Sequence, residues 1–169
     1  MRRIIGIDPG SRVTGYGIIA SDGMHSTHVV SGCIRVAGDD LPLRLADIFR
    51  QVSAIVAEFT PLEMAVEQVF MARNAASALK LGQARGAAIC AGVMAGLPVA
   101  EYSPRSIKLS VVGTGTADKQ QVQHMVGRIL QLEQKLTTDQ ADALAVALSH
   151  AHSSSTLMNI ARSGGGWRR

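Results

Sequence analysis

Residues 4–20 read IIGIDPGSRVTGYGIIA, and this stretch decides the fold class. An apolar run over residues 4–7 ends at Asp8-Pro9-Gly10, where aspartate, proline and glycine together are typical of a turn. After the turn, β-branched residues separated by glycines predict a second strand over residues 14–20. The stretch therefore predicts an antiparallel hairpin in which a carboxylate, that of Asp8, stands at the end of the first strand.

The residues that follow extend this hairpin into an α/β pattern. A third strand is expected at about residues 27–36, joined to the second by a turn around Asp22. Apolar side chains recur every three or four positions over residues 41–59, which predicts an amphipathic helix that ends at Pro61. A short strand over residues 64–69 comes next. The order strand, helix, strand is typical of a parallel crossover.

The second half of the chain predicts one more strand among several helices. Ser103-Pro104 is a typical helix start, with a serine cap and proline at the first helical position. Thr138 is expected to cap the last helix, which runs through His150. We expect one domain over residues 1–152, followed by a flexible tail over residues 153–169. The remaining expected elements are a helix over 74–95, a strand over 98–102 and a helix that includes 122–130.

The helix expected over residues 74–95 carries a stripe of small side chains. Each glycine in a helix interior costs about 1 kcal/mol relative to alanine, so close packing is a reasonable compensation. The sequence leaves open whether this packing occurs within the chain or against a second subunit. The stripe consists of Ala75, Ala78, Gly82, Gly86 and Cys90.

Composition excludes several classes of protein. Hydrophobic residues make up 47% of the 169 residues and charged residues 18%, which excludes a disordered chain. No apolar run reaches the roughly 18 residues of a membrane span, and the N-terminus does not resemble a signal peptide. Cys33 and Cys90 lie singly within apolar patterns, so we expect reduced, buried thiols and a cytoplasmic protein. A net charge of +4 favours an anionic partner.

Four acidic residues stand where packing alone explains them poorly. Asp8 ends one strand and Glu67 interrupts another, although a carboxylate buried without a partner is costly. Asp8 and Ile4 share one strand face, and a neighbouring strand could place Glu67 beside Asp8. Asp139 and Asp142 are three residues apart and so lie on one helix face.

Carboxylates that converge raise one another's pKa unless a cation neutralises them. Mg²⁺ prefers oxygen ligands, and a pair of such ions can activate water and stabilise the leaving oxygen in phosphodiester hydrolysis. The pattern therefore indicates a magnesium-dependent nuclease with two ions per site. The alternative is that Asp8 belongs only to a turn and that Asp139 and Asp142 only favour the helix dipole.

Eight blocks of sequence, in order along residues 6–145, resemble the RuvC family of bacterial Holliday junction resolvases. Each block alone is moderately specific, and their common order is the stronger argument. The blocks are GIDPGS at 6–11, TGYG at 14–17, EQVF at 67–70, SALKLGQARG at 77–86, YSPR at 102–105, VVGTG at 111–115, KQQVQHM at 119–125 and DQADALA at 139–145.

The resemblance implies a ribonuclease-H-like α/β fold with a five-stranded mixed sheet, three antiparallel strands followed by two parallel strands, flanked by helices. It implies a homodimer that nicks two strands of like polarity at a four-way DNA junction and works with the RuvA–RuvB branch-migration complex. It also implies Mg²⁺, replaceable by Mn²⁺.

The resemblance assigns roles to single residues as well. Asp8, Glu67, Asp139 and Asp142 match the metal-binding catalytic carboxylates. Phe70 matches an aromatic residue that stacks on junction bases, with core packing as the alternative. Lys108 and Lys119 match basic residues of the DNA channel, with solvated helix charges as the alternative. The weaker DNA-binding candidates are Arg85 and His124.

Three alternatives remain open at this point, and one of them is a related nuclease that acts on RNA or on transposon ends. The segment Asp-Pro-Gly-Ser after an apolar strand also resembles the first phosphate loop of actin-like or Hsp70-like nucleotide binders, which need a second subdomain. A junction-binding module without catalysis would use the same acids only for caps and hydration.

Overall fold

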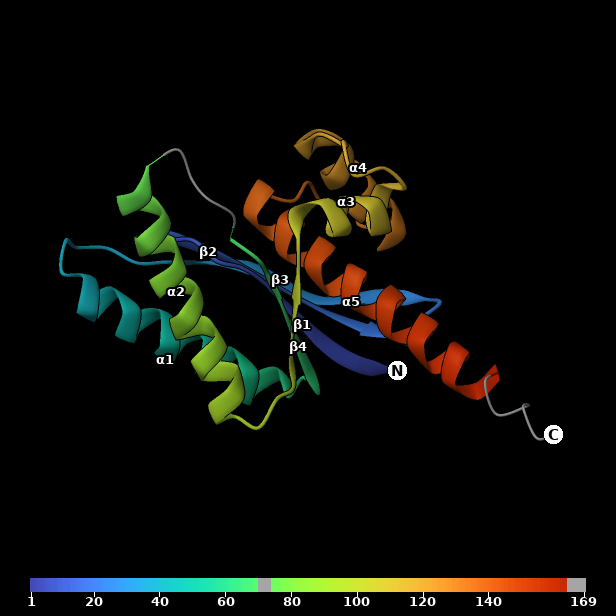
Figure 1. Ribbon diagram of the computed structural model, residues 1–169, viewed down its shortest axis with the longest axis horizontal. Helices are drawn as coiled ribbons and strands as arrows, with labels where there is room; N and C mark the ends of the chain where they lie inside the picture. Colours follow the sequence, from blue (N-terminus) through green and yellow to red (C-terminus); the bar gives the residue numbers. More distant parts are fainter. Residues whose placement is uncertain (70–73, 164–169) are drawn as a thin grey trace.

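Five strands form one mixed sheet in the computed structural model, which describes residues 1–69 and 74–163, with side chains as far as residue 154 (Figure 1). The strand order is β3-β2-β1-β4-β5. The pairs β1–β2 and β2–β3 are antiparallel, and β1–β4 and β4–β5 are parallel, so the predicted sheet is confirmed. The strands are β1 (Arg2–Asp8), β2 (Val13–Ser21), β3 (Ser26–Arg35), β4 (Glu63–Glu67) and β5 (Val99–Tyr102).

Helices cover both faces of this sheet. Helices α1 and α2 lie together on one face, and the long helix α5 crosses the other face with α3 and α4 beside it (Figure 1). None of the described helices is long and apolar enough to cross a bilayer. The helices are α1 (Leu41–Phe59), α2 (Ala75–Met94), α3 (Pro104–Val112), α4 (Lys119–Ile129) and α5 (Thr138–Ser163).

Polar side chains start the helices largely where the sequence predicts. The Ser103 hydroxyl accepts a hydrogen bond from the backbone N–H of Ser106 and so caps α3. The predicted cap at Thr138 is wrong by one residue. The hydroxyl of Thr137 accepts from the Gln140 N–H, and the Gln140 side chain accepts in return from the Thr137 N–H. This reciprocal pair satisfies two N–H groups that a new helix leaves free.

Strand alternation divides the core into two layers. Ile5 and Ile7 of β1 face α1 and α2, where they pack with Ile48 and Val52. Ile4 faces the other way and packs with the apolar side of α5. Asp8 has the parity of Ile4, so its side chain lies on the α5 face, as the sequence predicts.

Glycines of β1 and β2 allow α5 to approach the sheet closely. A Cβ atom added at Gly6 would lie 2.1 Å from the Ala143 carbonyl oxygen, and one added at Gly15 would lie 2.1 Å from the Asp139 carbonyl oxygen. Any residue larger than glycine at these two positions would require the helix to shift. The glycines therefore set the distance at which the acidic start of α5 passes the end of β1.

Two expectations need correction. Both cysteines are free, but neither is fully buried: Cys33 is half-buried and Cys90 is exposed. Cys90 is exposed because α2 turns its other side, with Ala84 and Ala88, toward the core. Helix α5 continues past the predicted end at His150 to Ser163, so the backbone is helical well into the expected tail. The division into a domain over 1–152 and a tail over 153–169 stays a prediction.

Candidate active site

The parallel pairing of β1 and β4 brings the first two acidic residues together. Ile7 lies beside Val66 in the register of the two strands, and the next residue on each strand is the acidic one. Asp8 and Glu67 both face α5, and their carboxyl groups share a hydrogen bond. The strand parity predicted from sequence thus produces the carboxylate pair.

Three helices complete a cleft around this pair. Helix α5 contributes Asp142, α3 contributes Lys108, and α4 contributes Lys119 as its first residue. The cleft has a volume of about 200 Å³. Asp8, Glu67 and Asp142 form the acidic floor of the cleft, and Lys108 and Lys119 form its basic rim. This arrangement suits a polyanion that is held above bound cations. The lining is completed by Pro104, Ile107, Val122 and Ala145.

Burial and charge repulsion shift the pKa of both strand carboxyls. Burial, and then the neighbouring Glu67 and Asp142, raise the pKa of Asp8 to about 8. Burial also raises the pKa of Glu67, with a further upward contribution from Asp142, although the hydrogen bond from Asp8 opposes it. Without a bound cation, Asp8 therefore holds a proton at neutral pH.

One lysine partly neutralises the acidic floor. The Nζ atom of Lys119 lies 3.1 Å from a carboxylate oxygen of Asp142. Burial lowers the pKa of Lys119, but the attraction of Asp142, Asp8 and Glu67 outweighs that effect and the net shift is upward. Lys119 is thus a fixed positive charge at the rim of the cleft.

Buried contacts hold the turn that follows Asp8. The Thr14 hydroxyl donates to the Gly10 carbonyl oxygen at 3.0 Å and lies 3.3 Å from the Gly10 N–H. Arg44 of α1 is nearly fully buried and donates to the Ser11 carbonyl oxygen. Sequence analysis did not single out Thr14 or Arg44, because the contacts that explain them join separate elements.

The fourth predicted carboxylate, Asp139, lies one turn before Asp142 but does not line the cleft. Its main chain rests on Gly15, the register partner of Asp8. As the side chains stand, the described residues include no set of three or more His, Cys, Asp or Glu groups that could hold a metal ion. The structure thus brings three of the four predicted ligands to one cleft, but their side chains are not arranged around a common metal position.

The remaining predicted DNA-binding residues have different surroundings. Phe70 lies outside the described residues. Arg85, on α2, does not line the cleft. Its side chain contacts the main chain of Glu67 and the carboxylate of Glu101 on β5. His124 lies on α4 beside a separate hollow.

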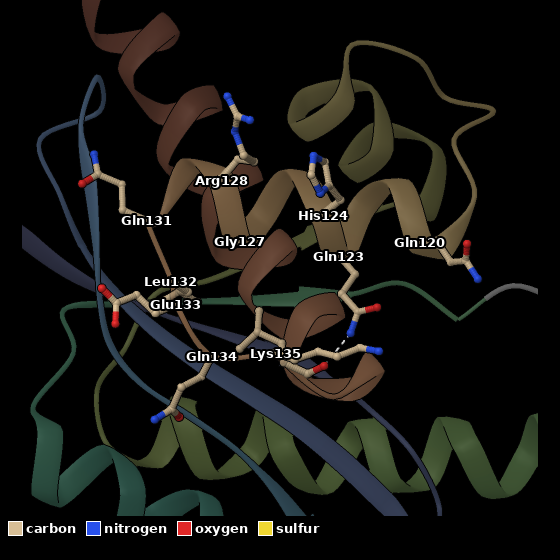
Figure 2. Close-up of a pocket in the computed structure, with 11 residues that line it drawn as sticks. Gln120, Gln123, His124, Gly127, Arg128, Gln131, Leu132, Glu133, Gln134 and Lys135 are labelled. Carbon is tan, nitrogen blue, oxygen red and sulfur yellow. Dashed lines mark hydrogen bonds between the residues drawn. The ribbon is translucent and has the colours of Figure 1, made fainter.

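That hollow is larger than the carboxylate cleft, at about 670 Å³. Figure 2 shows His124 and Arg128 extending from one side of α4, while Gln123 extends from another side toward the loop before α5. Gln123 donates to the Leu136 carbonyl oxygen and so fixes that loop. The lining is mainly amide and basic side chains, with Glu133 its only acid among the described residues, so the acid chemistry belongs to the smaller cleft.

Sequence reasoning also missed a buried polar network on the α5 face. His150, expected as the end of the last helix, is buried, and its Nδ1 lies 2.8 Å from the Tyr102 hydroxyl. Its Nε2 contacts Glu63, which also pairs with Arg2 at 3.2 Å. The available signal was the place of the histidine just after an apolar helical run over residues 143–148.

A mixed five-stranded sheet with helices on both faces, and a carboxylate cleft at the ends of its two central parallel strands, define a nuclease of the ribonuclease-H-like class. Residues 4–150 match the family described as crossover junction endodeoxyribonuclease RuvC. The chain therefore belongs to the RuvC family and is an endodeoxyribonuclease.

Individual relatives support this assignment. The crossover junction endodeoxyribonuclease RuvC of Shewanella sediminis is 59% identical over 160 residues, which cover 95% of this chain and 92% of the relative. The solved structure of T. thermophilus RuvC in complex with a Holliday junction substrate is 33% identical, with a TM-score of 0.87 and coverage of 92% and 96%. A yeast mitochondrial Holliday junction resolvase, 14% identical with a TM-score of 0.68, shares the fold.

Family membership decides between the alternatives that the sequence left open. A nucleotide-binding protein of the actin-like class and a binding module without catalysis are both excluded, because the matching family is one of endodeoxyribonucleases and the match spans nearly the whole chain.

Proposed function

We propose that this chain resolves four-way (Holliday) DNA junctions by symmetrical hydrolysis of two phosphodiester bonds in strands of like polarity. The observation that carries the proposal is the cleft in which Asp8, Glu67 and Asp142 form an acidic floor below Lys108 and Lys119. The T. thermophilus relative, whose structure contains a Holliday junction substrate, supports the choice of substrate.

The acidic floor fits a divalent cation. The pKa of Asp8 is raised to about 8 because the carboxyl is buried beside two other acids, and a cation would relieve that repulsion. We propose that Asp8, Glu67 and Asp142 hold Mg²⁺, with Asp139 from the same helix as a fourth ligand and two ions per site; Mn²⁺ can substitute. Bound magnesium would supply an activated water and a counter-charge for the leaving oxygen.

The rim of the cleft would hold the DNA backbone. Lys119 has its side chain 73% exposed and carries a fixed positive charge, so it can contact a phosphate next to the scissile bond. Lys108 of α3 lines the same cleft. Such contacts supply affinity that falls as salt rises. Stacking by Phe70 and DNA contact by His124 stay predictions.

The outward face of α2 supports a homodimer. Leu79, Gly82, Gly86, Cys90 and Val93 follow helical spacing along this face. An added Cβ would meet nothing within 4 Å at either glycine, and Leu79 and Val93 are exposed. At these four residues, the outward face of α2 therefore lacks a packing partner among the described residues. We propose that α2 of a second copy packs there, because symmetrical cutting needs two clefts and closed twofold dimers are the commonest assembly.

Docking on the RuvA–RuvB complex stays a prediction. A pull-down of this chain with RuvA–RuvB, with and without junction DNA, tests it.

The proposed activity is tested with a synthetic four-way junction, a plain duplex and single-stranded DNA, each with and without Mg²⁺. We expect paired nicks in the junction alone, and only with Mg²⁺. Asp8→Asn should keep junction binding and lose nicking by at least about a hundredfold, since an amide cannot replace the carboxylate as a metal ligand. Asp39→Asn changes an exposed aspartate and should cut at the normal rate.

Equal cutting of duplex and junction would contradict the substrate assignment. Magnesium-dependent nicking that survives in Asp8→Asn would contradict the role of the carboxylate cleft.

A further inference from the structure

Arg85 of α2 contacts the main chain of a cleft residue rather than the open face of the cleft. Its Nε donates to the Glu67 carbonyl oxygen at 3.2 Å. Its Nη2 lies 2.5 Å from a carboxylate oxygen of Glu101 on β5. The Arg85 side chain is only 20% exposed, so most of it is enclosed by the helix and the two strands that it joins.

The bond from Arg85 acts at the point where β4 ends. Glu67 is the last residue of the strand, and the N–H of the following Gln68 donates to the Tyr102 carbonyl oxygen of β5 at 2.8 Å. The peptide unit after Glu67 is therefore held on one side by β5 and on the other by Arg85. This peptide sets the direction in which the Glu67 side chain leaves the backbone toward Asp8.

We infer that Arg85 is a positioning residue for Glu67, which rests on the proposed metal-binding role of that carboxylate. The planar guanidinium holds two acceptors at a fixed separation, whereas a lysine ammonium is a point charge on a flexible stem. Residues that orient a metal ligand typically change metal affinity or activity by 10- to 100-fold when they are removed.

A direct DNA contact makes different predictions for the same residue. An arginine that neutralises one phosphate contributes to junction affinity and adds about 0.9 to the slope of log affinity against log salt. A positioning arginine leaves affinity and slope unchanged and acts on the chemical step. Two donors of Arg85 are already used inside the protein, which favours the second case.

The test compares Arg85→Ala with the unchanged protein on a four-way junction. Junction affinity is measured without Mg²⁺ by fluorescence anisotropy across a range of KCl concentrations. Cleavage is measured in single turnovers with protein in excess, across a range of Mg²⁺ concentrations. We expect a rate at least tenfold lower and a several-fold higher Mg²⁺ requirement, with affinity within about twofold and the same salt slope.

Two further variants make the result decisive. Arg50→Ala removes an exposed arginine that pairs with Asp47 on α1, and it should match the unchanged protein in every measurement. Arg85→Lys keeps the charge, so it guards against a loss of folding in Arg85→Ala, which thermal melting would reveal. We expect its cleavage rate to remain several-fold low, because an ammonium on a flexible stem does not fix the two acceptors in the geometry that the planar guanidinium sets.

A full cleavage rate in either Arg85 variant would overturn the inference. So would weaker junction binding with a shallower salt slope and a normal rate at saturation, which would make Arg85 a DNA contact. Failure of the unchanged protein to cut the junction would instead refute the proposed function.

Discussion

The proton on Asp8 makes the stability of the metal-free protein depend on pH. The pKa of Asp8 is 3.8 in an unstructured chain and about 8 in the folded protein, chiefly because of burial. Between these values the folded state binds more protons than the unfolded state, so the free energy of unfolding falls as pH rises from about 4 to about 8. Glu67 shifts in the same direction and adds to the effect.

We therefore expect the Tm measured without divalent cations to fall between about pH 5 and pH 8, and to fall less in Asp8→Asn, which has no carboxyl to ionise. Added Mg²⁺ should raise the Tm of the unchanged protein more at pH 8 than at pH 5, because protons compete with the cation for Asp8. Calorimetry at both pH values measures these differences. Parallel pH profiles for the two proteins would show that Asp8 is not the group responsible.

Single residues could be assigned from sequence where strand parity was enough. Asp8 was expected at the end of one apolar strand and Glu67 within another, where a neighbouring strand could place Glu67 beside Asp8. The parallel register of β1 and β4 brings the two residues together. Arg85 and His150 could not be assigned, because their partners lie on strands far away in the sequence. A charged residue in a helix of small side chains has several possible neighbours, and only the packing of α2 selects one.

At the scale of elements, the contact between α5 and the sheet positions Asp142. This contact depends on glycines, because backbone atoms of α5 occupy the space where side chains of β1 and β2 would lie. In Gly6→Ala the new methyl group would meet the Ala143 carbonyl and the Ala147 N–H, so the helix must move. We expect a loss of about 1–3 kcal/mol in the free energy of unfolding, the usual cost of overpacking, with slower cleavage.

The matched control is Gly127→Ala in α4, where an added methyl group meets nothing within 4 Å. This variant should gain about 0.5–1 kcal/mol, since alanine is the better helix former. Urea unfolding of the three proteins measures both changes. Equal stability of Gly6→Ala and the unchanged protein would mean that α5 can shift along the sheet without cost.

Most element bounds followed from sequence because local signals fix them. Capping side chains, prolines and apolar periodicity predicted both ends of α1 and the start of α3. The end of α5 was predicted too early, since the apolar pattern stops near Ala151 while the helix continues without it. Periodicity detects the part of a helix that packs, and it is silent about turns beyond the core.

At the scale of the whole molecule, the strand pairing could be predicted from sequence, but the shape and lining of the cleft could not. Its walls come from α3, α4 and α5, and only the packing of these helices in the folded protein brings the lining residues together. The described residues of one chain contain one acidic cleft of this kind. The proposed pair of cuts in strands of like polarity would therefore use a second cleft, and the second copy is proposed to pack on the outward face of α2.

Val93 lies on that outward face with 55% of its surface exposed, and we expect Val93→Glu to prevent dimer formation by placing a charge from each copy in the proposed apolar interface. Analytical ultracentrifugation should then give a species of the monomer mass, 17.8 kDa, while the unchanged protein gives twice that mass. Met24→Glu is the matched control, because it adds the same charge at an exposed methionine in the turn between β2 and β3. The monomer should make single unpaired nicks, since its own cleft is intact. Paired nicking by a monomeric Val93→Glu would separate symmetrical cutting from this interface.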